Sequence, residues 1–519
     1  MTHALNNPLA EVGRKARPAR PTPVSPSPAT PTRNKVGGFS HGALAAVLLA
    51  VGLAGTLVEG PIVALGIAVS ALVVTAILAL PVSSVVLGLL FVVLAVDNPL
   101  TRPSDGKWNS PWHFAGKLIF ENLKPLKFNV IDVVMLVLTI RVLFTAWTSH
   151  RVAHRIGAMG NVAKLFAKAT GLALAAVVGL EIYGIATGGD FSNSLWQIRP
   201  LLWTPCLALV VAGSFTADDR RKFRKVVLAA AVLKAFEAIF VHFFVAKPRH
   251  LDIAYVTTHG DSPLFALATA ILVILWFERR THTAFRWMTA GAVLWFIAMT
   301  LNNRRIAWVA LAGCLVFAFA VAERPVKRSF AKLLGLTWPL LLVYSLVGLK
   351  SNSPVFKPVK MVQSVVLQND RSSDTRDVEN FNLSFTFRGN PLIGSGFGHP
   401  YVELVRGDDI SKAFPQYRYL PHNSLLGLWA FGGMLGAAAF WLPLVVGIAY
   451  AARTLRDDAR AVVRIDAIIA VSAVICYMVQ AWGDIGLQDW VGVLLGSVGC
   501  GIAGSLARPV RADLAKATA

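Results

Sequence analysis

Residues 466–486 read DAIIAVSAVICYMVQAWGDIG, and residues 490–507 read WVGVLLGSVGCGIAGSLA. Each run is long and apolar enough for an α-helix to cross the hydrocarbon core of a membrane. Similar runs recur along the 519-residue chain, of which 55% is hydrophobic and only 15% charged. Soluble proteins carry about 25% charged residues. The composition excludes soluble enzymes, secreted disulfide scaffolds and disordered proteins, and it predicts an all-α polytopic membrane protein.

The apolar runs predict about 14 (12–14) transmembrane helices. Alternating ten-residue strands are absent from the sequence, so helices are the only plausible spanning element. The predicted spans lie near residues 41–59, 61–80, 81–97, 130–148, 168–187, 201–216, 227–246, 263–278, 287–301, 306–322, 333–349, 422–451, 466–486 and 490–507.

Charge predicts the orientation of these spans. The chain has 50 Lys and Arg against 28 Asp and Glu, which gives a net charge of +22. If the N-terminus is cytoplasmic, the cytoplasmic segments hold 29 Lys and Arg and the outer segments 19, of which 14 lie in the long loops 97–129 and 350–421. Short cytoplasmic loops collect Lys and Arg, so the count favours cytoplasmic N- and C-termini. The positive charge therefore reflects topology and anionic membrane lipids rather than nucleic acid.

The chain divides into five predicted parts. The first part is a basic tail with seven prolines, which we expect to be disordered and cytoplasmic. The loop 350–421 is too long to be a plain connection between two spans, so we expect the chemistry of the protein to lie there. The parts are the tail 1–40, transmembrane helices 1–11 over 41–349, the large periplasmic or extracytoplasmic loop 350–421, transmembrane helices 12–14 over 422–507, and the cytoplasmic tail 508–519.

Neither cysteines nor acids suggest a metal or a disulfide. The four cysteines lie singly inside apolar runs and lack metal-ligand spacing. The acids of the large loop are scattered, and only Asp408 and Asp409 are adjacent. Mg²⁺ and Mn²⁺ need converging carboxylates, so we expect no metal and no cofactor.

Several short motifs stand in a fixed order in and after the large loop. They are Ser373-Asp374-Thr375-Arg376, then Arg388-Gly-Asn390-Pro391-Leu-Ile-Gly394-Ser-Gly396-Phe-Gly398-His399, then Pro421-His422-Asn423-Ser424, and finally the pair Gly432-Gly433. Upstream, Asn302-Asn303-Arg304-Arg305-Ile306-Ala307-Trp308 opens a span.

Over roughly residues 200–445, this order resembles the O-antigen ligase and O-antigen polymerase superfamily (Wzy-C type membrane glycosyltransferases) of bacterial glycan assembly. The pattern of that family is an Arg, an Asn-Pro-Leu-x-Gly-x-Gly turn, and His-Asn-Ser before a helix with a Gly pair. The resemblance implies a GT-C-like membrane fold with one large outer loop. Arg304 stands where the family usually has Ser.

His422 is the candidate catalytic residue. It lies at the predicted start of a span, where the partial positive charge of a helix N-terminus opposes imidazolium formation. A neutral His can act as a general base near pH 7. On its own, such a His is more often an interfacial side chain that hydrogen-bonds to headgroups or water.

The resemblance assigns two further sets of residues. It implies that Arg305 and Arg376 bind the diphosphate of a lipid-linked donor, with Arg304 and Arg199 as second candidates. The guanidinium fork matches phosphate oxygens and keeps its charge. Asn390, Pro391, Gly394 and Gly396 are expected to shape a tight turn in the loop.

Two functions remain open from the sequence. The first is a metal-independent inverting glycosyltransferase in the bacterial cytoplasmic (inner) membrane. It would move a glycan from a polyprenyl (undecaprenyl) diphosphate donor to a hydroxyl of a glycan or lipid A-core acceptor, in ligation or polymerisation of O-antigen or another surface polysaccharide. The second is a lipid-linked glycan flippase or other secondary transporter. Polymerase, ligase and protein O-glycosyltransferase are not separated.

Overall fold

The computed structural model describes residues 74–96, 119–120, 129–151, 163–250, 256–350 and 371–507, apart from positions 76, 280, 408, 410, 412, 413 and 459, together with a few positions between 351 and 363. The predicted tails 1–40 and 508–519, the predicted span 41–59 and most of span 61–80 lie outside the described residues.

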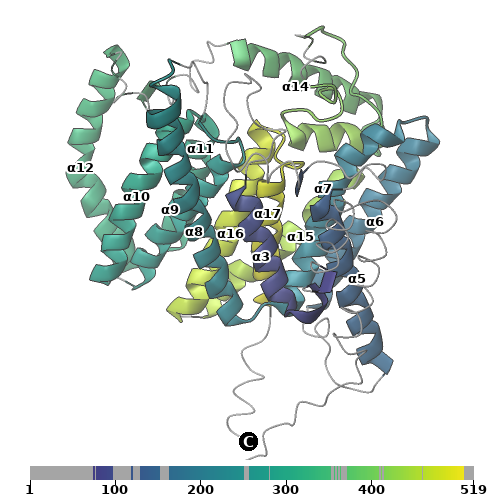
Figure 1. The fold of residues 1–519 in the computed structure, drawn as a ribbon, viewed down its shortest axis with the longest axis horizontal. Coiled ribbons are helices and arrows are strands. Elements are labelled where there is room, and N and C mark those ends of the chain that lie inside the picture. The colour runs from purple at the N-terminus through teal and green to yellow at the C-terminus, as the bar shows by residue number, and fades with distance from the viewer. Residues whose placement is uncertain are drawn as a thin grey trace, which may run out of the picture. The chain divides into compact units, whose positions relative to one another are not determined.

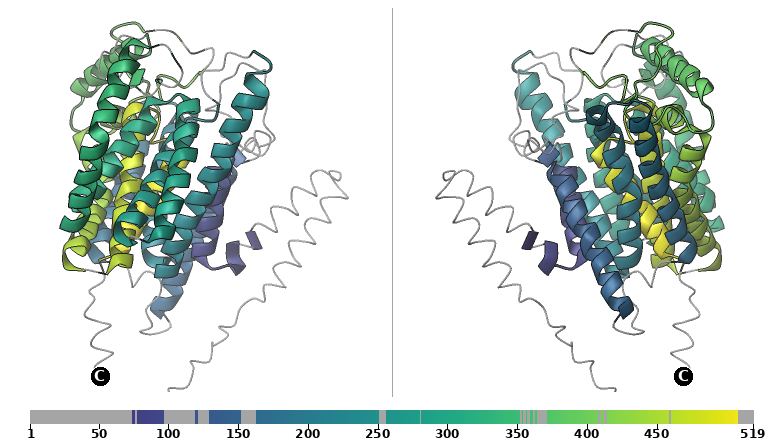
Figure 2. Two further views of the ribbon diagram at one scale, coloured as in Figure 1. Left: turned by 90° about the vertical axis from the view of Figure 1, so that its left-hand side faces the viewer. Right: turned by 90° about the vertical axis from the view of Figure 1, so that its right-hand side faces the viewer.

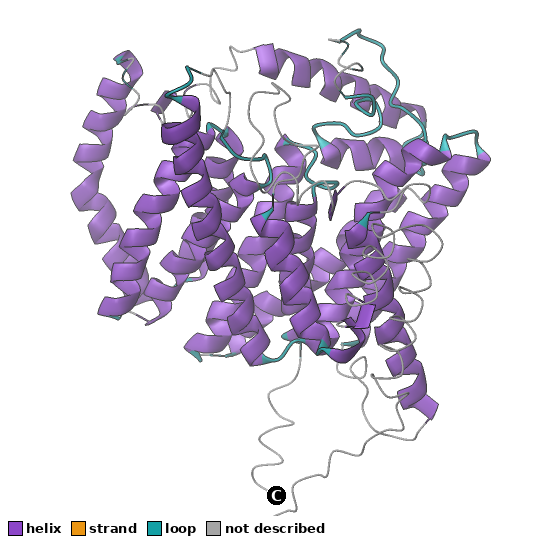
Figure 3. Ribbon diagram, viewed as in Figure 1, coloured by secondary structure: helices purple, strands orange, loops and turns teal. Residues whose placement is uncertain are grey.

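Within the described residues the chain is helical and contains no strand (Figure 3). These residues form thirteen α-helices and one π-helix. In chain order they are α3 (Val82–Ala95), α5 (Val130–Arg151), α6 (Lys164–Ala186), α7 (Phe191–Ser214), α8 (Ala217–Phe240), η3 (Val241–Ala246), α9 (Asp261–Arg279), α10 (His282–Asn302), α11 (Arg305–Val321), α12 (Arg324–Lys350), α14 (Arg371–Gly389), α15 (Ser424–Asp457), α16 (Ala461–Gly483) and α17 (Trp490–Ser505).

Eight helices in the described part of the chain are long and apolar enough to cross a membrane, and three shorter helices are also apolar. The protein is therefore a multi-pass membrane protein, and the prediction of an all-α membrane fold is confirmed at this level. The predicted number of fourteen spans includes segments for which the structure gives no description.

Helices α8 and α14 are two of the places where the structure departs from the predicted spans. Helix α8 begins ten residues before the predicted span 227–246, because Thr216 and Asp219 cap each other's backbone N–H groups in a capping box. Inside the predicted loop 350–421, residues Arg371–Gly389 form α14. Helix α14 lies across one end of the bundle (Figures 1 and 2), and we call this end the α14 end.

Helix α17 lies at the centre of the described bundle. All sixteen of its residues are buried, and it packs against α7, α15 and α16. A Cβ on Gly499 would lie 2.7 Å from the carbonyl oxygen of Ala470, and one on Gly501 would lie 2.6 Å from that of Ala208. These glycines therefore let the backbone of α17 approach the backbones of α16 and α7 closely, which is how membrane helices gain van der Waals contact.

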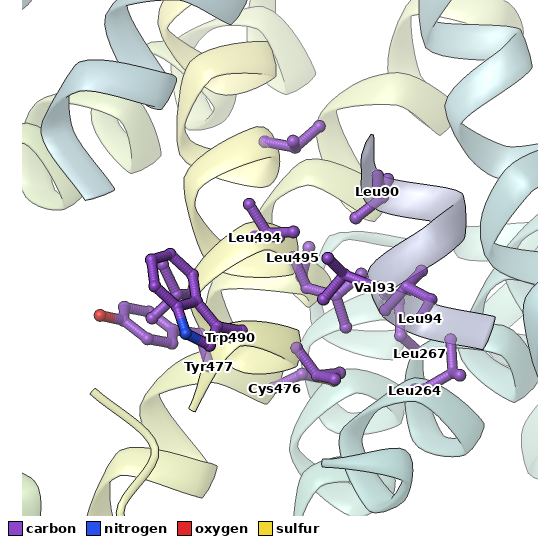
Figure 4. Close-up of a cluster of buried hydrophobic side chains, with 14 of the residues drawn as sticks. Leu90, Val93, Leu94, Leu264, Leu267, Cys476, Tyr477, Trp490, Leu494 and Leu495 are labelled. Atoms are coloured by element: carbon purple, nitrogen blue, oxygen red, sulfur yellow. The ribbon is translucent and has the colours of Figure 1, made fainter. Parts of the chain in front are cut away.

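The apolar core continues from α17 to helices distant in sequence. Figure 4 shows Val93 and Leu94 of α3 beside Leu267 of α9 and Leu494 and Leu495 of α17. All five side chains are at most 1% exposed. The N-terminal half of the described chain is thus attached to the C-terminal helices by close apolar packing.

Buried ion pairs join helices at the opposite end of the bundle. Asp466 of α16 accepts hydrogen bonds from Arg220 Nε at 2.8 Å and Arg224 Nη1 at 2.9 Å, both from α8. Arg464 of α16 pairs with Glu278 of α9 at 3.2 Å. Breaking one partner of such a pair would leave a buried charge uncompensated, so these contacts hold α8, α9 and α16 in register.

Helix α15 is interrupted at Gly433, and the turn 390–396 fills the interruption. Gly433 has φ +58° and ψ −168°, a conformation that favours glycine. Beyond the break, the N–H of Met434 donates to Pro391 O at 2.8 Å and that of Leu435 to Leu392 O at 3.1 Å. The turn carbonyls therefore satisfy N–H groups that an interrupted helix would otherwise leave unpaired in the apolar bundle.

The turn is also bound on the other side of the break. The N–H of Ser395 donates to Ala430 O at 3.1 Å, and that of Gly396 donates to Phe431 O at 2.8 Å. A Cβ on Gly394, whose φ is +75°, would lie 2.4 Å from the carbonyl carbon of Phe431. The glycine-rich turn and the glycine pair of α15 therefore form a single interlocked feature.

Replacing Gly433 by Ala should destabilise the protein by at least about 2 kcal/mol, through the unfavourable φ and a Cβ 2.4 Å from the carbonyl carbon of Leu392. Thermal unfolding of the purified, detergent-solubilised protein measures the change. The control is Gly179→Ala in α6, where a Cβ meets nothing within 4 Å and helix propensity favours alanine. Equal unfolding temperatures of the two variants would contradict the docking of the turn.

Candidate active site

A pocket of about 250 Å³ lies at the α14 end, where several helix ends meet. Its walls come from the junction of α10 and α11, from α14, from the start of α15 and from the end of α16. The lining residues are 303–306, 309, 376–377, 380, 422–423 and 482–484. Most of them are polar, and we call the apolar side chains of Ile306, Val309 and Trp482 the apolar flank.

His422 lines this pocket and is held twice by one carboxylate. Glu379 of α14 accepts a hydrogen bond from the His422 backbone N–H at 3.1 Å, and its other oxygen lies 3.2 Å from His422 Nδ1. The side chain of His422 is 35% exposed and that of Glu379 is 8% exposed. Because an ionised carboxylate only accepts hydrogen bonds, Nδ1 carries the hydrogen and Nε2 is the ring nitrogen left for a ligand.

The same contact changes the basicity of His422. The hydrogen bond to Glu379 raises the pKa of His422 above the ordinary value of about 6.5, and it outweighs the lowering effect of burial. The sequence analysis considered only the N-terminus of α15, which has the opposite effect on the charge of the imidazole. The structure places a carboxylate beside the ring, so a neutral His422 is a stronger base than an isolated histidine.

Three of the four predicted arginines lie together in the pocket. Arg304 and Arg305 come from the start of α11, and Arg376 comes from α14. The first turn of α11 adds the partial positive charge of a helix N-terminus. The pocket also contains Asp377 and Asp484. Three arginines that line one pocket make a site for an anion with several oxygens, such as a phosphate.

The fourth predicted arginine lies elsewhere. Arg199 is inside α7 with its side chain 7% exposed, and its Nη1 lies 3.0 Å from Asp132 Oδ2 of α5. Trp203 Nε1 donates to the other oxygen of Asp132 at 2.8 Å. Arg199 does not contribute to the lining of the pocket. Its observed contacts connect α5 with α7.

The predicted turn residues Asn390, Pro391, Gly394 and Gly396 also lie outside the pocket lining. They belong to the turn that docks into the break of α15. The N–H of Gly394 donates to Asn390 O at 2.8 Å, which closes the turn. Because α14 ends at Gly389, this turn holds the helix that carries Arg376 and Glu379.

Sequence reasoning missed three acidic or basic groups at the site. Glu379 follows Arg376 by three residues, the spacing of neighbours on one helix face, but the sequence predicts a loop here. Asp484 lies inside the predicted span 466–486, and the sequence assigns it no role. His259, which contacts Asp484 at 2.6 Å, stood in no motif.

Other polar side chains of the pocket suit a ligand rich in hydroxyl groups. Asn303, Asn380 and Asn423 each present an amide, and Asn423 Nδ2 donates to Asn380 Oδ1 at 3.1 Å. In the part of the chain that the structure describes, no group of three or more His, Cys, Asp or Glu side chains has the arrangement to hold a metal ion.

Comparison with known proteins identifies one domain. Residues 290–441 match the family described as O-antigen ligase (Wzy_C), so this stretch is an O-antigen ligase family domain. The matched range includes α11, α14 and the start of α15, and hence His422, Glu379 and the three pocket arginines. No curated protein gives a significant match to the chain.

Replacing Glu379 by Gln should lower the pKa of His422, because the carboxylate is the largest influence that raises it. His422 then loses its proton at a lower pH than in the wild type. Diethyl pyrocarbonate modifies neutral imidazole, so the pH midpoint of His422 modification, followed by peptide mass spectrometry, should move to lower pH. Asp377→Asn removes a pocket carboxylate that does not bond to His422 and should move the midpoint much less. Equal shifts in both variants would contradict the assigned cause.

Proposed function

We propose, from the O-antigen ligase domain at residues 290–441, that this protein moves a glycan from a polyprenyl (undecaprenyl) diphosphate donor to an acceptor hydroxyl. The family implies a membrane glycosyltransferase of polysaccharide ligation or polymerisation. The observation that carries the proposal is the pocket in which His422, oriented by Glu379, lies with Arg304, Arg305 and Arg376.

In the proposed reaction, His422 acts as the general base. Its Nε2 accepts the proton of the acceptor hydroxyl, and the oxygen attacks the anomeric carbon of the donor glycan. The bond between that carbon and the phosphate oxygen breaks, and polyprenyl diphosphate leaves with the electron pair. A single displacement of this kind inverts the anomeric configuration.

The arginines act on the leaving group. Arg305 and Arg376 bind the diphosphate, and their charge stabilises the negative charge that grows as the glycosidic bond breaks. Arg304 provides a third guanidinium at the same pocket. This charge stabilisation does the work that a divalent metal does in other glycosyltransferases, so the proposed reaction proceeds in the presence of EDTA.

The apolar flank of the pocket supports a lipid-linked donor. Ile306 and Val309 continue from Arg305 along α11, and Trp482 of α16 is 56% exposed beside them. A polyprenyl chain that leaves the diphosphate in this direction enters the apolar region between the helices. Amides on the other walls suit the glycan of the donor and the hydroxyl of the acceptor.

We propose that the pocket faces the outer side of the bacterial cytoplasmic membrane. It lies at the same end of the bundle as α14, which belongs to the loop 350–421 that the charge count assigns to that side. The N- and C-termini are then cytoplasmic. The acceptor is a growing glycan in polymerisation and lipid A-core in ligation, and the two reactions share the same donor.

Transport of a lipid-linked glycan is the competing function. The three clustered arginines suit binding of the diphosphate in either case. A proton acceptor beside a phosphate-binding pocket is needed to activate an acceptor hydroxyl, whereas transport of the intact donor requires no such activation. Purified protein that moves the donor between leaflets of a vesicle without transferring the glycan would favour transport.

His422→Gln should reduce glycan transfer by at least about a hundredfold and leave donor binding nearly unchanged. Glutamine keeps similar length and hydrogen bonding but does not act as a base near neutral pH. The assay uses purified protein, a polyprenyl-diphosphate glycan and EDTA, with donor binding measured separately. Near-normal turnover would remove His422 as the base, and loss of donor binding would make it a phosphate ligand instead.

Arg376→Lys should impair transfer nearly as much as Arg376→Ala, because lysine keeps the charge but loses the planar fork that binds two phosphate oxygens. The comparison uses kcat/KM for the lipid-linked donor. Arg453→Lys, at the exposed C-terminal end of α15 and far from the pocket, is the matched control and should retain full activity. Full activity of Arg376→Lys would show that only a diffuse positive charge is needed.

A further inference from the structure

A second histidine–carboxylate pair adjoins the pocket, whose lining includes its carboxylate, Asp484, and it takes no part in the reaction as proposed above. His259 precedes α9, and Asp484 follows the last residue of α16. His259 Nδ1 lies 2.6 Å from Asp484 Oδ2. The other ring nitrogen, Nε2, makes a hydrogen bond with Nη2 of Arg304. Three side chains from different parts of the chain thus form one row that ends at the pocket.

The chemistry of the guanidinium group determines which atoms donate in this row. Arginine has only N–H donors and keeps its proton at any physiological pH. His259 Nε2 must therefore accept the hydrogen bond from Arg304. In a neutral imidazole the hydrogen then resides on Nδ1, which donates to the carboxylate of Asp484. The opposite tautomer would place two N–H groups against each other.

Asp484 is held firmly and remains ionised. Its Oδ1 accepts the N–H of Ile485 at 2.9 Å, and its backbone carbonyl accepts the hydroxyl of Ser424 at 3.0 Å. Burial alone would raise the pKa of Asp484, but its hydrogen-bonded contact with His259 and the hydrogen bond from the N–H of Ile485 hold it below its usual range. The acceptor for His259 Nδ1 is therefore a carboxylate.

The turn that carries His259 is equally constrained. Asn302 Oδ1, at the end of α10, accepts the N–H of Thr257 at 3.1 Å, and Asp261 Oδ2 accepts the N–H of Thr258 at 2.8 Å. A Cβ on Gly260 would lie 2.7 Å from Asp489 Oδ2, so the turn fits closely against the start of α17. A histidine on such a turn can hold a neighbouring side chain in one orientation.

We infer that Asp484 and His259 are positioning residues. Asp484 fixes the tautomer of His259, and His259 in that tautomer orients Arg304 toward the donor diphosphate. The inference rests on the proposed function for the identity of the ligand. Arg304 touches the phosphate, and His259 and Asp484 act through it. An arginine side chain loses much rotamer freedom when it binds a ligand, and a hydrogen bond formed before binding reduces that loss.

The placement of Asp484 has a second effect in this scheme. Its charge also contributes to raising the pKa of His422. The same carboxylate therefore supports the group that binds the donor and adds to the basicity of the group that activates the acceptor. Donor binding and activation of the acceptor therefore both depend on the carboxylate of Asp484.

A double-mutant cycle on donor binding tests the inference. The probe is farnesyl diphosphate, bound to the full-length protein in nanodiscs. Arg304→Ala should weaken binding at least about tenfold, as loss of a charge-assisted contact does. His259→Ala should weaken binding by about threefold to tenfold. The double variant should bind no more weakly than Arg304→Ala alone, because His259 acts only through Arg304.

A matched control separates this effect from general damage. His399 also makes two hydrogen bonds at the α14 end, to Thr187 Oγ1 at 3.0 Å and to Gly184 O at 3.1 Å, and it lies outside the pocket lining. His399→Ala should leave the affinity for farnesyl diphosphate unchanged. An equal loss of affinity in His399→Ala and His259→Ala would overturn the inference.

A spectroscopic measurement tests the tautomer without a ligand. In ¹⁵N-histidine-labelled protein, His259, assigned by its absence from His259→Ala, should show a protonated Nδ1 and an unprotonated Nε2. Asp484→Asn offers an amide N–H to Nδ1 and should reverse the two or mix them, with a loss of donor affinity similar to that of His259→Ala. A protonated Nε2 in the wild type would overturn the inference.

The possible failures are distinguishable. A wild-type protein that does not bind farnesyl diphosphate contradicts the proposed function, and with it the ligand assigned to Arg304. Tight binding by the wild type together with additive losses in the double variant contradicts the positioning role alone. A His259→Ala variant that binds farnesyl diphosphate as tightly as the wild type would also contradict the positioning role alone.

Discussion

The candidate site depends on the docking of turn 390–396 into the break of α15. The turn supplies the backbone partners that α15 lacks at Gly433, through hydrogen bonds on both sides of the break. Helix α14 runs directly into the turn, and His422 stands just before α15 begins. The docked turn therefore sets α14 at the height where Glu379 meets His422 and Asn380 meets Asn423. The hydrogen bonds of Glu379 with His422 and of Asn380 with Asn423 add to the same arrangement.

The two histidine–carboxylate pairs at the site differ in the partner of Nε2, and this difference gives the two histidines different roles. His422 uses Nδ1 to bind Glu379, and Nε2 remains for a ligand of the pocket. His259 uses Nδ1 to bind Asp484 and Nε2 to bind Arg304. An imidazole with both nitrogens engaged by the protein orients its neighbours, whereas one with a nitrogen facing a pocket can exchange a proton.

The sequence predicts the general fold and part of the site, and the limits of the prediction have physical causes. Apolar runs mark the spans because a helix must satisfy its own backbone in lipid. The ordered motifs indicate His422, Arg304, Arg305 and Arg376, which the structure brings to one pocket. Arg199 does not line this pocket and pairs with Asp132 instead. The two residues are 67 positions apart, and nothing in the spacing of the sequence indicates the pair. The contact between His259 and Asp484 spans 225 positions and depends entirely on how helices pack. Helix α14 was missed because its low hydropathy resembles that of a loop.

The short central helix α17 has a consequence for biogenesis. Its sixteen residues extend about 24 Å, less than the roughly 30 Å of a bilayer core, so α17 alone is poorly suited to span the membrane. Helix α16 has 23 residues and ends only six residues before α17 starts. We therefore expect the two helices to enter the bilayer together as a hairpin. Asp484 and Asp489, at the two ends of the connecting turn, would then cross the membrane in one insertion event.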